Sequence, residues 1–82
     1  MIKVLFFAAI REQLDTNALE VEAKGINTVA DIKKLLAQKG ELWQQVFANA
    51  TLLNAVNEQM VNDDTVVKDS DTIAFFPPVT GG

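Results

Sequence analysis

The best candidate for a reactive group in this chain lies in its last residues, and it is a backbone group and not a side chain. The sequence contains no histidine and no cysteine. These absences exclude imidazole general bases, thiolate nucleophiles, disulfides and zinc sites built from these two residue types. Residues 74–82 read AFFPPVTGG and finish at Gly81 and Gly82. Neither glycine has a reactive side chain, so the chemical group that this segment offers is the backbone carboxylate of Gly82.

A terminal carboxylate must be activated and must reach its reaction partner. A carboxylate is a poor electrophile, because its charge and its resonance discourage attack by a nucleophile. Gly81 and Gly82 lack Cβ atoms, so they fit a narrow channel. Pro77 and Pro78 stop the preceding strand and direct the tail as an extended, semi-rigid segment. The sequence predicts a tail that enters another protein.

The composition restricts the class of partner. The 82 residues are 49% hydrophobic and 22% charged, as in one small globular domain. The formal net charge of −4 repels phosphate backbones, so we expect no nucleic acid and favour a basic protein surface. The acidic residues 63 and 64 are interpreted as a solvated turn, so no metal site is predicted.

No segment indicates a membrane or an export signal. The apolar stretch VLFFAAI near the start is shorter than the ~20 residues that a membrane helix needs. It is also short for a signal peptide and lacks a clear cleavage site. We therefore expect a cytoplasmic protein with no membrane partner.

The tail must be positioned by the elements that precede it, and the first two are predicted strands. Residues 2–8 are rich in β-branched and aromatic types, and residues 18–23 alternate apolar residues with glutamates. Residues 11–17 are polar and are predicted to form a connection, so the two strands can pair as a hairpin.

A helix follows the predicted hairpin. Thr28 and Asp31 have the spacing of a capping box, with Asp in place of Glu. Apolar residues then recur at helical spacing, at Val29, Ile32, Leu35 and Leu36. Gly40 is expected to end this helix. Residues 41–48 are predicted to form a second short helical segment that packs Trp43 and Phe47 under the core.

Shorter strands complete the chain. Residues 52–57 predict a strand, residues 58–61 a turn and another short strand, and residues 72–76 the final strand after a polar turn at 68–71. The order predicts an α+β fold, with a mixed sheet covered on one face by one main helix. We expect a domain over residues 1–76 and a flexible, extended C-terminal tail over residues 77–82.

Side-chain parity separates the two aromatic pairs of the predicted first and last strands. Neighbouring residues in a strand point to opposite faces of the sheet. We assign Ile2, Val4, Phe6, Ile73 and Phe75 to the core under the helix. Leu5, Phe7 and Phe76 then lie on the open face, where we expect them to form an exposed apolar patch that binds a partner.

The order of elements resembles the ubiquitin-like β-grasp pattern, and three segments narrow the resemblance. MIKVLFFAAIRE, LLNAVNEQMV and DSDTIAFFPPVTGG closely resemble the small subunit of molybdopterin synthase (the MoaD family), a ubiquitin-like sulfur carrier. The resemblance covers essentially the whole chain, and FFPPVTGG is its most specific part. Ser70 departs from it, because the family commonly has glycine there in a D-G-D turn.

The resemblance implies a specific reaction. Gly82 would be adenylated, converted to a thiocarboxylate and inserted into the large subunit, MoaE, where it would donate sulfur to cyclic pyranopterin monophosphate in molybdenum cofactor biosynthesis. An adenylating enzyme that resembles ubiquitin-activating enzymes (MoeB) would use ATP and Mg²⁺ to recharge the tail. This chain would bind no cofactor and would have no turnover alone.

The resemblance also implies which residues contact the partner. It places Met60 near the apolar patch, with a core position as the alternative, and it places Arg11 near the same interface, with a plain solvated arginine as the alternative. The full expected set is Leu5, Phe7, Arg11, Met60, Phe76, Pro77, Pro78, Val79 and Thr80. Two other functions stay open: a sulfur carrier for thiamine thiazole synthesis, and a ubiquitin-like modifier or pure interaction module.

Overall fold

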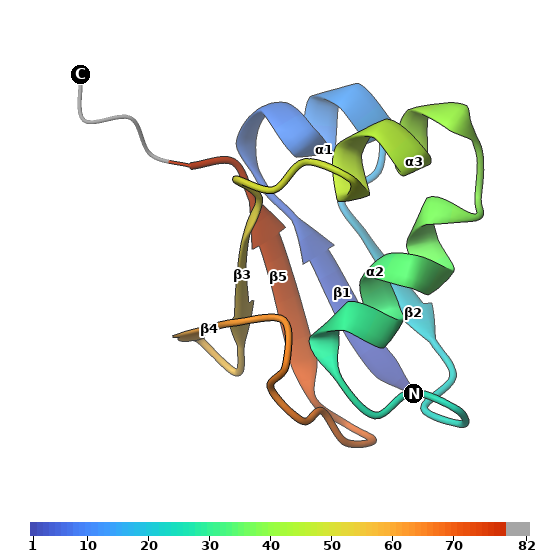
Figure 1. Cartoon of the computed structure of the whole chain (residues 1–82), viewed down its shortest axis with the longest axis vertical. Helices are drawn as coiled ribbons and strands as arrows, with labels where there is room; N and C mark the ends of the chain where they lie inside the picture. The colour runs from blue at the N-terminus through green and yellow to red at the C-terminus, as the bar shows by residue number, and fades with distance from the viewer. Residues whose placement is uncertain (79–82) are drawn as a thin grey trace.

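The middle of the sheet is built from the two ends of the chain (Figure 1). In this computed structural model, which describes residues 1–78, the strand order is β2-β1-β5-β3-β4. β1 (Ile2–Phe6) lies parallel to β5 (Thr72–Phe76), and β2 (Ala18–Val21) pairs with the other side of β1 in antiparallel orientation. β3 (Leu53–Val56) and β4 (Gln59–Val61) continue the sheet beyond β5 as antiparallel strands. The predicted mixed sheet is confirmed.

The main helix begins at the predicted capping box. α2 spans Val29–Ala37 and packs across one face of the sheet (Figure 1). The Asp31 N–H donates to the Thr28 hydroxyl at 3.4 Å, and the Asp31 carboxylate accepts the N–H groups of Thr28 at 3.1 Å and Asn27 at 2.8 Å. These bonds satisfy N–H groups that have no partner within the helix.

The predicted role of Gly40 was wrong. The C-cap of α2 is Gln38, and Gly40 instead caps the start of α3 (Glu41–Phe47). The backbone of Gly40 is extended, with φ 163° and ψ 174°, so it is not the left-handed residue that ends many helices. Its carbonyl accepts the N–H of Gln44 at 2.9 Å, which closes the first turn of α3. The second helical segment was predicted correctly.

A third helix was not predicted. α1 covers Ala8–Leu14, where we expected the end of a strand and a polar connection. The strand stops at Phe6 because Ala8 takes a positive φ of 55° and turns the chain. Ile10 and Leu14, one helical turn apart, are buried and hold α1 on the domain. β1 and β2 therefore pair as predicted, but through a helical connection and not a tight hairpin.

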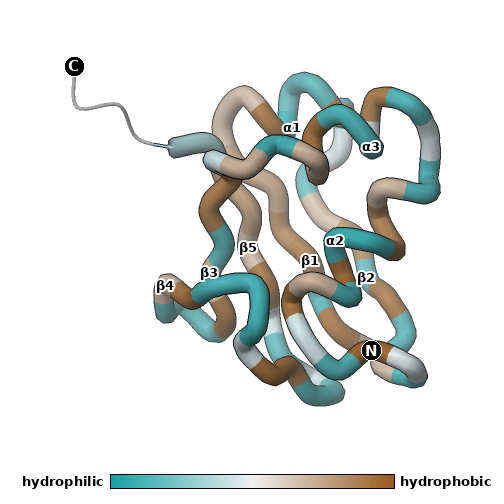
Figure 2. Tube along the Cα trace, in the orientation of Figure 1, coloured by the Kyte–Doolittle hydropathy of each residue, from teal (hydrophilic) through white to brown (hydrophobic). Residues whose placement is uncertain are grey.

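The core lies between the helices and the sheet, and its aromatic residues form one cluster. The Phe6 ring lies 5.6 Å from Trp43, 6.2 Å from Phe47 and 6.3 Å from Phe75, centroid to centroid. Figure 2 shows hydrophobic positions along β1 and β5, the two central strands. Every residue assigned to the core by parity is at most 2% exposed: Ile2, Val4, Phe6, Ile73 and Phe75.

Two turns contain residues in the left-handed backbone region. Asn57 and Glu58, between β3 and β4, have φ values of 49° and 72°. Positive φ at both central residues is the requirement of a type I′ hairpin turn. Ser70 has a φ of 77°, which explains why a glycine suits this position. The turn still forms, because the Asp71 carboxylate accepts the Lys68 N–H at 2.8 Å.

Within residues 1–78, none of the helices has the length and apolar character required to cross a membrane.

Candidate functional site

The face of the sheet opposite the helices carries an apolar groove of about 540 Å³. Its apolar lining comes from four adjacent strands and the residue after β1: Leu5, Phe7, Ala55, Met60, Ala74 and Phe76. Asn57, Glu58 and Thr72 form its polar rim. The structure thus brings together four of the residues that the sequence nominated for partner binding.

Strand register explains why this face is hollow. Leu5 is the partner of Ala74, Ala74 is the partner of Ala55, and Ala55 is the partner of Met60, so the four side chains form one row across the sheet. The two alanines occupy the middle of the row and the larger side chains occupy its ends. A row with this order of sizes leaves a depression in the centre of the sheet. The sequence analysis missed both alanines: Ala74 has the strand parity of Phe76, whereas Ala55 is placed only by its register with Ala74 and Met60.

Two large side chains of the groove, those of Phe7 and Met60, are exposed. Phe7 is 44% exposed and Met60 is 57% exposed, whereas Leu5 and Phe76 are half-buried. The alternative core position for Met60 is therefore wrong. Exposed apolar side chains gathered in one place are typical of a binding surface, and methionine adapts its shape to a partner.

Phe7 is held at the groove by the turn that ends β1. Its N–H donates to the carbonyl of Phe75 at 3.1 Å, and its backbone is extended, with φ −125° and ψ 154°. Ala8 then takes the left-handed conformation, which costs an alanine roughly 1–2 kcal/mol. Backbone strain of this kind is common at functional sites, so the conformation of Ala8 supports a functional role for the neighbouring Phe7.

The polar rim is fixed by hydrogen bonds around Asn57. The Asn57 N–H donates to the Thr72 carbonyl at 2.8 Å, and the Asn57 side-chain oxygen accepts the Thr72 N–H at 3.0 Å. The Asn57 amide also donates to Asp71 at 3.0 Å. That bond, followed by the bond from the Lys68 N–H, lowers the pKa of the Asp71 carboxyl. The hairpin that carries Glu58 is therefore tied to the start of β5.

The other nominated residues divide into two groups. Pro77, which is half-buried, and Pro78, which is exposed, follow Phe76 directly at the end of β5. Arg11 is exposed on α1 and does not line the groove. Val79, Thr80, Gly81 and Gly82 lie outside the described residues, so the predicted reactive group is known here from sequence alone. Among residues 1–78, no three acidic side chains are placed to share a metal ion.

Residues 4–82 match the ThiS family. The chain belongs to the ThiS family. Over its full length this ThiS family member is 45% identical to the molybdopterin synthase sulfur carrier subunit of Escherichia coli and 42% identical to that of Haemophilus influenzae, with the whole of each relative covered.

Solved structures agree with the fold of this ThiS family member. SAMP1 from Haloferax volcanii superposes with a TM-score of 0.81 at 23% identity, covering 99% of this chain and 98% of that one, which shows the ubiquitin-like β-grasp fold. A complex of subunits 1 and 2 of the molybdopterin-converting factor from Helicobacter pylori contains a chain that matches with a TM-score of 0.69 at 27% identity, covering 99% and 97%. That relative was therefore solved together with a second subunit.

Proposed function

We propose that this chain is the sulfur-carrier subunit of a molybdopterin synthase. The observation that carries the proposal is 45% identity to a relative with that name, in an alignment that covers the whole of both chains. The apolar groove at the base of the tail supports it, because a carrier must dock on another protein before its terminus reacts. A cytoplasmic location belongs to the same proposal.

In this proposal Gly82 carries the sulfur. Its carboxylate is adenylated by a MoeB-type enzyme that binds ATP and Mg²⁺, and a sulfur nucleophile then displaces AMP to leave a thiocarboxylate. The thiocarboxylate donates sulfur to cyclic pyranopterin monophosphate in the active site of the large subunit. This chain supplies the acyl group that carries the sulfur, and Gly81 adds no side chain next to it.

The apolar groove on the open face of the sheet is the proposed binding site for the large subunit, MoaE. Leu5, Phe7, Met60 and Phe76 would receive apolar side chains of that subunit, and Arg11 would lie at the periphery. Residues 77–80 would then run from the interface toward the reaction site. The Helicobacter pylori complex of two subunits supports a partner of this kind.

The distance from the groove to the reaction site follows from chain length. Six residues run from Pro77 to Gly82. Fully extended, they reach at most about 20–22 Å. The active site of the large subunit must therefore open within that distance of Phe76, and Pro77 and Pro78 direct the tail toward it at a reduced entropic cost.

The test combines intact mass with turnover. The chain is incubated with the activating enzyme, ATP, Mg²⁺ and a sulfur source, and its mass should rise by the difference between one sulfur and one oxygen atom. The purified thiocarboxylate should then form molybdopterin from precursor when the large subunit is added. A chain that gains no sulfur, or that instead becomes linked to lysine side chains, would contradict the proposal.

A further inference from the structure

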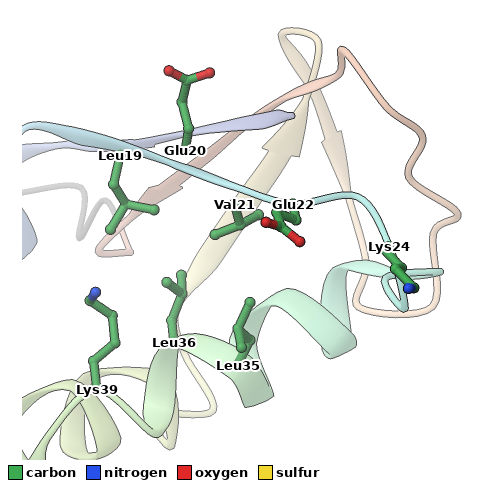
Figure 3. Close-up of a pocket in the computed structure, with 8 residues that line it drawn as sticks. All are labelled: Leu19, Glu20, Val21, Glu22, Lys24, Leu35, Leu36 and Lys39. Carbon is green, nitrogen blue, oxygen red and sulfur yellow. The ribbon is translucent and has the colours of Figure 1, made fainter.

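A second groove lies on the helical side of the sheet, at the edge farthest from β4. It has a volume of about 430 Å³ and lies between β2 and α2. Figure 3 shows Leu19 and Val21 directed from β2 toward Leu35 and Leu36 of α2. Leu35 is 41% exposed, although the helical pattern placed it with the core residues. The proposed docking of the large subunit uses none of these residues.

The strand beside this groove has backbone groups directed away from the sheet. The Phe6 N–H donates to the Asn17 carbonyl at 2.9 Å, which fixes the alternation of the antiparallel β1–β2 pair. By this alternation Leu19 and Val21 bond to β1, whereas Ala18 and Glu20 direct their N–H and C=O groups outward. Because β2 is an edge of the sheet in residues 1–78, a further strand can add there.

A second copy of this chain is a poor occupant of that edge. Antiparallel pairing of two β2 strands centred on Glu20 would place the two Glu20 carboxylates opposite each other. Each copy also carries a formal net charge of −4. Both effects oppose self-association, and the Glu20 carboxylate by itself favours a basic residue opposite it in any segment that pairs with β2.

We propose that the β2–α2 groove binds an extended segment of another protein by antiparallel strand addition. Figure 3 shows Glu20 directed away from α2, so the residue paired with Glu20 lies on that same side and is basic. The residues before and after it point into the groove and are apolar, because they contact Leu19, Val21 and Leu35.

The ends of the groove define the rest of the ligand. Lys39 lies at one end and Lys24 at the other (Figure 3). The Lys39 ammonium is 5.2 Å from the centre of the Trp43 ring, which restricts where it can lie. Side chains three positions from the central basic residue point to the groove side, so they meet these lysines and are acidic. The expected ligand is therefore a segment of seven residues whose types are, in order, acidic, any, apolar, basic, apolar, any and acidic.

This site is separate from the proposed carrier interface. It lies on the opposite face of the sheet and at the opposite edge from the β3–β4 hairpin. A protein bound there leaves the apolar groove and the base of the tail accessible. The β2–α2 groove therefore suits a partner that binds this chain while the tail reacts in the active site of another protein.

The test uses one synthetic peptide, Ac-Glu-Thr-Val-Lys-Val-Thr-Glu-NH₂, added to the full chain labelled with ¹⁵N. Saturable amide shifts should appear in residues 18–24 and 29–39. Leu35→Ser should weaken binding by at least about tenfold. The control is Leu42→Ser, because Leu42 has a similar exposure of 44% but lies on α3, outside the groove; its affinity should not change. Amide spectra of both variants verify that they are folded.

Two methylated peptides test strand addition itself. An N-methyl group on the central lysine removes the N–H that bonds to Glu20 and should weaken binding at least about tenfold. The same group on the following valine faces solvent and should leave the affinity within about twofold. Equal effects of the two methyl groups, no saturable shift at millimolar peptide, or shifts confined to the apolar groove on the other face would each overturn the proposal. So would concentration-dependent self-association through β2 without peptide.

Discussion

Phe6 and Phe7 are neighbours in the chain and lie on opposite sides of the sheet. Phe6 is 2% exposed and packs against the aromatic core, whereas Phe7 is 44% exposed and lines the apolar groove. The alternation of side chains along β1 produces this separation. One pair of identical residues therefore tests packing and docking independently.

Phe7→Ala should leave the fold intact and weaken docking to the large subunit by about 2–4 kcal/mol, as the loss of an aromatic anchor does. Phe76→Ala should act in the same direction. Calorimetric titration with the purified large subunit measures the affinity, and thermal unfolding measures stability. Unchanged affinity with a large loss of stability would contradict the assignment of these residues to the interface.

Phe75→Ala should have the opposite profile. Phe75 is fully buried, with its ring 5.0 Å from Phe47, so its truncation leaves a cavity in the core. We expect the free energy of unfolding to fall by about 3–5 kcal/mol, enough to threaten a domain of this size. Urea denaturation measures the change, and near-wild-type stability would refute the packing described here.

Removal of Gly82 should abolish sulfur transfer and hardly change stability. One residue fewer retracts the carboxylate by up to about 3.3–3.6 Å, and misplacement by about 1 Å can already cost a hundredfold in rate. The assay is molybdopterin formation with the large subunit, with complex formation measured in parallel. A truncated chain that binds but does not react isolates the chemistry, whereas normal turnover would disprove the role of Gly82.

Leu35 and Leu36 should respond differently to truncation. Leu36 is 1% exposed, and Leu36→Ala should destabilise the fold by about 2–5 kcal/mol. Leu35 is 41% exposed, and Leu35→Ala should change stability by no more than about 0.5 kcal/mol. Chemical denaturation of the two variants side by side gives the comparison. Equal losses would contradict the difference in burial between the two leucines.

Asp31→Asn should make the stability of the fold less dependent on pH in the acidic range. Hydrogen bonds from the N–H groups of Asn27 and then Thr28 lower the pKa of the Asp31 carboxyl below its ordinary value of 3.8. A lowered folded-state pKa stabilises the fold above the unfolded value, and this contribution is lost as pH falls through the folded value. The Tm of the variant should fall less steeply below about pH 4 than that of the wild type. Parallel curves would refute the linkage.

Glu58→Gly should stabilise the chain by up to about 1 kcal/mol, because glycine adopts a positive φ without the steric cost of a Cβ atom. Glu58 has a φ of 72° in the β3–β4 turn. Glu58→Ala removes the same carboxylate but keeps the Cβ atom, so it is the matched control and should not stabilise. Thermal unfolding separates the two, and equal stability would contradict the strain.

Much of the fold was predictable because its strands and main helix are strongly patterned. β5 was predicted at its observed bounds, since the polar turn before it and the prolines after it fix both ends. α1 was missed because the predicted strand extended through Ala8 and residues 11–17 were interpreted as a polar connection. The available signal in the sequence was the pair of apolar residues Ile10 and Leu14 at helical spacing.

The candidate site was predictable in part. Alternation along β1 and β5 was enough to place Leu5, Phe7 and Phe76 on one face. The position of Ala55 between Ala74 and Met60 depends on the register between strands, which no local pattern contains. Gly40 was misassigned because its residue type suits both the end of one helix and the start of the next, and only the backbone angles decide.

The central parallel pair has a mechanical consequence. Tension applied to the chain from Pro77 passes directly into β5, which is bonded on one side to β1 and on the other to β3. Force along a strand with two bonded neighbours shears both ladders at once and does not peel bonds one at a time. The N-terminal end of β1 and the C-terminal end of β5 lie at opposite ends of the sheet (Figure 1), so pulling between them produces this shear. A partner protein that binds the tail can therefore pull on it without readily unfolding the domain.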